Sequence, residues 1–167
     1  GKKLTADDIV YTIETAKNAD YASPQRVNWQ GVTVTKINDT TIIFKLDNKY
    51  AQFLNSLTLG ILPKHIWVNV QPINFAASDY NLKPIGAGPY MFDKLQKDDL
   101  GQLQSYQLTS NKNYYAGRPY IDIIIFKFYN SEDTLIDAYN RNDIQDLAFV
   151  SPENLNKLKF RQRLNIQ

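Results

Sequence analysis

The sequence predicts a globular α/β protein, and three patterns along the chain support this prediction. A capped amphipathic helix pattern opens the chain, alternating apolar and polar residues then indicate a β-hairpin, and a strand–helix–strand pattern occupies 120–150. The 167 residues are 43% hydrophobic and 22% charged, so a sizeable core is available and low-complexity disorder is excluded. We expect one domain or two small lobes.

The first element is predicted to be a helix over about 5–17. Thr5 suits the N-cap position, and Asp8 lies three residues further on, as in a capping box. Ile9 and Ile13 fall on one face at helical spacing. A loop leads from this helix to the predicted hairpin.

The hairpin is predicted from two alternating segments, 32–35 and 42–46, which flank a turn near Asn38. A short helix is expected at 51–57. An irregular stretch should then run as far as Tyr80, because prolines and polar residues interrupt every periodic pattern there.

The second half of the chain is predicted to start with strands over 90–96 and 102–110, joined by a polar turn. The next strand, 120–128, is apolar on both of its faces. A strand of this kind is typical of the middle of a covered sheet. We therefore expect it to be central and buried on both sides.

A helix beginning at Ser131 should follow, with Asn142 as its left-handed stop. A strand over 144–150 would complete the strand–helix–strand unit, and a proline at 152 should begin another helix. The chain also starts close to a helix cap and ends within an expected strand at 163–167. We therefore expect it to be a piece of a longer protein.

The composition excludes several classes of function. Nineteen Lys and Arg against 17 Asp and Glu leave a net charge of +2, which is too small for the basic surface that nucleic acid requires. The absence of cysteine excludes disulfides, thiolate nucleophiles and Cys-based metal sites. No apolar run of about 18 residues indicates a membrane span, and the first residues lack the apolar core of a secretion signal.

The ionisable residues do not indicate catalysis. Asp7 and Asp8 fall in the first turn of the predicted helix, where the macrodipole favours anions, and Asp98 and Asp99 fall in a hairpin turn. His65, the only histidine, has no neighbouring Gly-x-Ser-x-Gly elbow. We therefore predict no catalytic residues, and with one histidine and no EF-hand spacing we predict no metal.

A cofactor is not indicated either. The Gly-Ala-Gly of 86–88 lacks both the third glycine of a dinucleotide fingerprint and the Gly-Lys-Ser/Thr of a phosphate loop. Aromatic residues are the more informative excess, with 11 Tyr, 8 Phe and 2 Trp. Most should pack in the core, but tyrosine also suits recognition of mixed polar and apolar ligands such as peptides or sugars.

Several phrases resemble a known family, in the order in which that family has them. They are LTADDIVY (4–11), ILPKHI (61–66), PIGAGPY (84–90) and NKNYYAGRPYID (111–122), followed by the strand–helix–strand pattern. Together they resemble the extracytoplasmic solute-binding proteins of ABC transporters, in the oligopeptide and dipeptide class known as family 5. The resemblance covers nearly the whole chain.

The resemblance implies part of a two-lobed, periplasmic-binding-protein-like α/β fold with a mixed sheet, flanking helices and a small α+β subdomain. Residues 1–80 would form part of the small extra subdomain of the first lobe, and 81–167 part of its main sheet running toward the hinge. The second lobe, which in this family supplies the acidic residue for the peptide amino terminus, would be absent here.

The implied function is non-catalytic. The whole protein would bind an oligopeptide between its lobes and deliver it to ABC permease subunits, as a monomer without cofactors, in the periplasm or lipid-anchored at the outer face of the membrane. Members that carry nickel chelates or oligosaccharides leave the ligand class open. A carbohydrate-active enzyme and an interaction domain are the alternatives from other classes.

The candidate ligand-binding residues are Ala148, Phe149, Val150 and Ser151, because ligands sit beyond strand ends in open α/β sheets and these residues occupy the matching family position. Tyr21, in the loop after the first helix, is a further candidate, and an exposed loop tyrosine without a ligand is an equal interpretation. The family's Gly-Glu-Ile-Asp phrase reads Asn-Asp-Ile-Gln-Asp at 142–146. This leaves the register of Phe149 open by one position, which in a strand would exchange its face.

Overall fold

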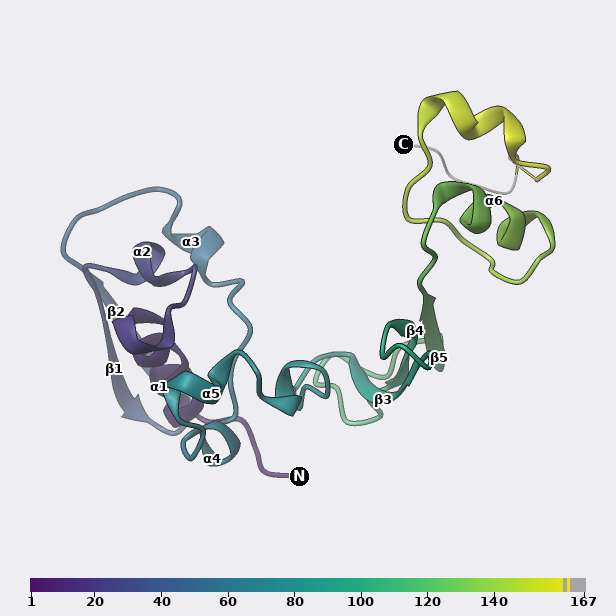
Figure 1. Cartoon of the computed structure of the whole chain (residues 1–167). Coiled ribbons are helices and arrows are strands. Elements are labelled where there is room, and N and C mark those ends of the chain that lie inside the picture. Colours follow the sequence, from purple (N-terminus) through teal and green to yellow (C-terminus); the bar gives the residue numbers. More distant parts are fainter. Residues whose placement is uncertain (161, 163–167) are drawn as a thin grey trace. The chain divides into compact units, whose positions relative to one another are not determined.

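The computed structural model describes residues 1–160 and 162, and the chain divides into two compact units (Figure 1). Unit 1 comprises 1–92 and 111–118, and unit 2 comprises 93–110 together with the chain from 119 onward. Both units contain helices and an antiparallel sheet. Among the described residues, no helix combines the length and apolar character needed to cross a membrane.

Unit 1 begins with a helix, continues with a hairpin and then runs through short helical turns. Its elements are α1 (Ala6–Lys17), η1 (Ala19–Tyr21), α2 (Arg26–Trp29), β1 (Val32–Asn38), β2 (Thr41–Leu46), α3 (Phe53–Ser56), α4 (Lys64–Trp67), α5 (Pro72–Phe75) and η2 (Asp79–Asn81). The irregular stretch predicted up to Tyr80 is therefore wrong in detail, because single helical turns too short to show a period occupy much of it.

The predicted first helix is confirmed as α1, which follows Thr5 in extended conformation. The Asp8 carboxylate accepts a hydrogen bond from the Thr5 backbone N–H at 2.8 Å, satisfying a donor at the start of the helix. The apolar face of α1 places Ile13 in a buried cluster with Trp29 and Val32. This cluster is the core of unit 1.

The predicted hairpin is also confirmed. Strands β1 and β2 pair antiparallel, with Val34 opposite Phe44. The inward residues of β1 are buried and the residues between them are exposed, as period-two alternation requires. Phe44 packs against both Trp29 and Phe53, so the hairpin, α2 and α3 share one aromatic core.

The second sheet has the order β3–β4–β5, with β3 (Tyr90–Lys97), β4 (Leu103–Ser110) and β5 (Ile123–Lys127). The three predicted strands are therefore present. The prediction that the third is central and covered on both sides is wrong for the described chain, since β5 is the edge of this sheet. Ile123 and Ile125 are each about half exposed, because the described residues place β4 on one side of β5 and no strand on the other.

Helix α6 (Glu132–Asn140) is confirmed together with both of its predicted ends. The Ser131 hydroxyl accepts a hydrogen bond from the Thr134 backbone N–H at 3.2 Å, and Asn142 has a left-handed φ of +63°. The helix buries Ile136 and Tyr139 against Leu158. These residues form the core of the C-terminal part of unit 2.

The strand predicted over 144–150 is wrong, because the structure has a loop there. Ile144, Leu147 and Val150 all pack on the core of α6, and a spacing of three cannot point to one face of a strand, where side chains repeat every two residues. The helix predicted to begin at Pro152 is present as the 3₁₀ helix η3 (Pro152–Lys157). The strand predicted at 163–167 lies outside the described residues.

Candidate functional site

The candidate segment Ala148–Ser151 lies in the loop between α6 and η3. Val150 is partly buried against the core of α6, whereas the neighbouring Phe149 is 71% exposed. In the part of the chain that the structure describes, the backbone groups of Ala148 and Phe149 make no hydrogen bond. The segment therefore offers an apolar side chain, peptide groups without a hydrogen bond among the described residues, and a fixed anchor beside them.

That anchor is a hydrogen-bonded link between Ser151 and Glu132. The Ser151 hydroxyl and backbone N–H both donate to the Glu132 carboxylate, at 2.8 and 2.5 Å. Glu132 is the first residue of α6, so its charge also interacts favourably with the helix macrodipole. The two hydrogen bonds from Ser151, the hydroxyl first, lower the pKa of Glu132 from its ordinary value.

Tyr21, the other candidate, belongs to unit 1, whereas the segment Ala148–Ser151 belongs to unit 2. It is the last residue of η1, and its ring meets Phe75 edge-on with centroids 4.8 Å apart. Phe75 in turn packs on Trp67 at 4.4 Å. Tyr21 is partly buried, so this aromatic cluster gives it a packing role within unit 1.

Asp8, Asp7 and Asp98 have structural partners: Asp8 caps α1, Asp7 forms an ion pair, and Asp98 stabilises a turn. Asp7 forms an ion pair with Lys36 at 2.6 Å, and this hydrogen bond lowers its pKa. The Asp98 carboxylate accepts from the backbone N–H groups of Leu100 and Gln102 in the β3–β4 turn. Over residues 1–160 and 162, no three acidic or histidine side chains are grouped to hold a metal ion.

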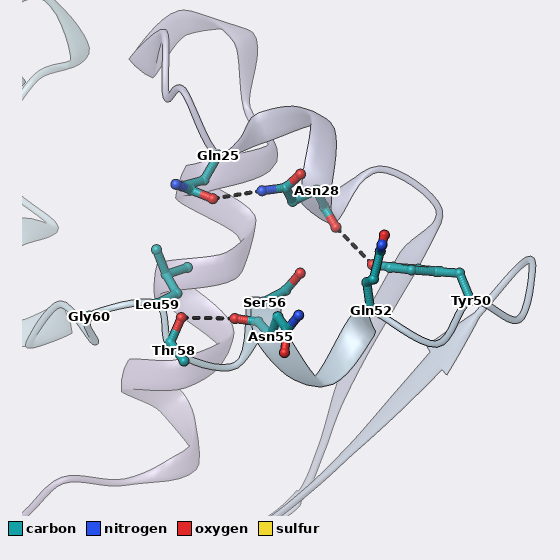
Figure 2. Close-up of a pocket in the computed structure, with 9 residues that line it drawn as sticks. All are labelled: Gln25, Asn28, Tyr50, Gln52, Asn55, Ser56, Thr58, Leu59 and Gly60. Atoms are coloured by element: carbon teal, nitrogen blue, oxygen red, sulfur yellow. Dashed lines mark hydrogen bonds between the residues drawn. The ribbon is translucent and has the colours of Figure 1, made fainter.

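A polar groove of about 520 Å³ in unit 1 was not predicted from the sequence (Figure 2). It lies between the α2 segment and the chain from Tyr50 through α3 to Gly60. Its residues come from two stretches about 25 positions apart that share no periodic pattern. The carboxamide-rich composition of both stretches is the one signal that points to it, as in Gln52 and Asn55.

The profile of "Bacterial extracellular solute-binding proteins, family 5 Middle" matches residues 1–167. The oligopeptide-binding protein AppA of Bacillus subtilis is 33% identical over 96% of this chain and 30% of its own length. Its structure with a nonapeptide gives a TM-score of 0.77 at 32% identity, covering 87% of this chain and 29% of AppA.

Two further solved structures are similar. The ABC transporter substrate-binding protein CtaP of Listeria monocytogenes gives a TM-score of 0.82 at 31% identity, covering 96% of this chain and 32% of CtaP. NikZ of Campylobacter jejuni, solved with Ni(L-His), gives 0.77 at 29% identity, covering 87% of this chain and 28% of NikZ. The chain thus spans about a third of the length of these relatives. It carries part of their α/β fold and belongs to family 5 of the bacterial extracellular solute-binding proteins.

Proposed function

We propose that this chain is part of the substrate-binding component of an ABC importer that binds oligopeptides. The observation that carries the proposal is the 33% identity, over 96% of the chain, to a protein named for oligopeptide binding. The whole protein would close two lobes around the peptide and present it to a membrane permease. Its role would be binding rather than catalysis.

The segment Ala148–Ser151 would form part of one wall of the peptide site. An extended peptide satisfies its main-chain groups by pairing with free backbone groups, and Ala148 and Phe149 offer such groups. The exposed Phe149 ring would cover apolar parts of the ligand. Tyr21, which belongs to unit 1, remains a separate candidate for contact with the ligand.

The organisation of the whole protein follows from the same proposal. Residues 1–80 would belong to the small subdomain of the first lobe and 81–167 to its main sheet, with the second lobe supplied by other parts of the protein. The complete protein would act as an extracytoplasmic monomer, periplasmic or lipid-anchored. Its partners would be the peptide and the permease subunits.

The test is native mass spectrometry of the full-length gene product, comparing the native mass with the mass after denaturation. A series of peptide masses released on denaturation is the expected result. The most abundant peptide is then resynthesised and its affinity measured by calorimetry. Phe149→Ala should weaken the affinity roughly tenfold, or about 1.4 kcal/mol. Leu100 is also an exposed apolar residue, and Leu100→Ala should leave the affinity unchanged.

The similarity to NikZ, solved with Ni(L-His), favours nickel chelates as the second candidate ligand class. The same purified sample distinguishes the two classes by elemental analysis. Stoichiometric nickel without released peptides would replace the oligopeptide proposal with the chelate one. Peptide release with unchanged affinity in Phe149→Ala would keep the receptor function but remove this residue from the site.

A further inference from the structure

The groove between the α2 segment and α3, here named the α2–α3 groove, lies entirely within unit 1 (Figure 2). Its volume of about 520 Å³ falls in the range of small-molecule sites. Trp29 of α2 and Phe53 of α3 pack against each other in the core of unit 1, and neither lines the groove. The residues of α2 and α3 that line the groove, Asn28, Asn55 and Ser56, are all polar.

The lining of the α2–α3 groove is polar but carries no charged side chain. Four carboxamides line it, from Gln25, Asn28, Gln52 and Asn55. A carboxamide donates through its nitrogen and accepts through its oxygen. The remaining polar side chains are hydroxyls, which also donate and accept. Every polar side chain of the groove is thus able to make both kinds of hydrogen bond.

Part of this lining is already held in place. Tyr50 is 40% exposed, yet its hydroxyl donates to the Asn28 carbonyl at 3.1 Å and its ring meets Phe53 edge-on. The Asn28 amide donates to the Gln25 carboxamide oxygen at 2.8 Å, which orients both side chains (Figure 2). Because these groups are ordered before a ligand arrives, binding would lose less side-chain entropy.

We propose that the α2–α3 groove binds a short neutral oligosaccharide. Sugar hydroxyls donate and accept at the same atom, which matches a lining of carboxamides and hydroxyls. The half-exposed Tyr50 ring provides a flat apolar surface for the carbon–hydrogen face of a sugar ring. An ionised ligand would lose water in the groove without gaining an opposite charge, so the lining selects against it.

The groove shares no residue with the proposed peptide-binding residues, because its lining belongs to unit 1 and includes neither Tyr21 nor any residue of Ala148–Ser151. The inference goes beyond the transport function and does not rest on it. A failure of peptide binding therefore leaves the saccharide prediction testable on the same sample. A failure of saccharide binding likewise leaves the peptide proposal testable.

The experiment uses the full-length gene product and a panel of malto-, cello-, manno- and xylo-oligosaccharides. Saturation-transfer NMR identifies any binder, and calorimetry gives its affinity. Asn55→Asp keeps the side-chain shape but places a carboxylate in the groove, so we expect at least about tenfold weaker binding. Asn74→Asp makes the same change at an exposed position on α5, outside the groove, and should leave the affinity unchanged.

Three results would overturn the proposal. The first is that no saccharide of the panel binds. The second is that Asn55→Asp binds as tightly as the unmodified protein. The third is that saturating peptide displaces the saccharide competitively, which would place the sugar in the peptide cleft. Binding that Asn55→Asp weakens and saturating peptide leaves intact supports the α2–α3 groove.

Discussion

The carboxylate of Asp8, in the first turn of α1, accepts a hydrogen bond from the backbone N–H of Lys64 at 2.8 Å. The two residues are 56 positions apart in sequence. One helical turn later, the Thr12 hydroxyl accepts from the backbone N–H of Leu62, also at 2.8 Å. Helix α1 is thus fixed to the segment that leads into α4, and two of the phrases that mark the family are joined.

The other two family phrases are joined in the same way. The backbone N–H of Asn111 donates to the carbonyl of Pro89 at 2.7 Å, and its side-chain amide donates to the carbonyl of Gly88 at 2.8 Å. Each phrase therefore supplies one half of a hydrogen-bonded contact between segments that are distant in sequence. These contacts give the phrases a structural role in the fold.

Replacing Asp8 by alanine should destabilise the folded protein. Asp8 is 6% exposed and its two carboxylate oxygens accept from the backbone N–H groups of Thr5 and Lys64. Removing the buried acceptor leaves two partly buried backbone N–H groups without this partner, so we expect a loss of about 1–3 kcal/mol in the free energy of unfolding. Urea unfolding followed by circular dichroism measures it.

Asp7 supplies the matched control for that measurement. It is the neighbouring residue on the same helix turn, but its ion pair with Lys36 is solvent-accessible. Exposed ion pairs contribute little to stability. Asp7→Ala should therefore change the unfolding free energy far less than Asp8→Ala, and equal losses in the two variants would refute the role given to Asp8.

Replacing Glu132 by glutamine should loosen the candidate ligand segment without unfolding it. The carboxylate accepts two hydrogen bonds from Ser151, and an amide offers a single oxygen in place of two. We expect faster amide hydrogen exchange at 148–151 and several-fold weaker peptide affinity, with the core of α6 unchanged. Glu153→Gln, two residues beyond Ser151, is the control and should alter neither quantity.

The link between Glu132 and Ser151 should also respond to pH in a defined direction. Its hydrogen bonds hold the pKa of Glu132 below the ordinary value of 4.5. Because the pKa of Glu132 is lower in the folded state than in the unfolded state, the ionised carboxylate stabilises the folded protein. This contribution is complete above pH 4.5 and is lost as the pH falls through the lowered pKa. The Ser151 amide chemical shift should titrate below pH 4.5, and a midpoint at or above that value would contradict the link.

The elements that the sequence predicts correctly are those with local causes. Thr5 and Ser131 mark helix starts through their own hydrogen-bonding groups, and alternation in β1 reflects burial of one face. The surroundings of β5 depend on which strands flank it, which no pattern within 120–128 encodes. The apolar residues at 144–150 likewise contact α6 rather than a neighbouring strand.

Both candidate sites depend on contacts between residues that are distant in sequence, so local patterns do not predict them. The anchoring of Ser151 depends on Glu132, 19 positions earlier, and the α2–α3 groove needs Asn28 and Asn55 to approach across the hairpin. Neither relationship follows from spacing along the chain. The exposure of Phe149 is a further consequence of the loop conformation. In a strand over 144–150, alternation of the side chains would have determined which face of the sheet carries Phe149.

Asn142 offers a test of a conformation that was predicted from sequence and is present in the structure. Its φ of +63° lies in the left-handed region, where asparagine and glycine are tolerated and β-branched side chains are not. Asn142→Val should therefore lower the unfolding free energy by about 1–2 kcal/mol, whereas Asn142→Gly should be close to neutral. Thermal unfolding of the two variants compares them directly. If the glycine variant lost as much stability as the valine variant, the side-chain interactions of Asn142, and not its backbone conformation, would account for its role at the end of α6.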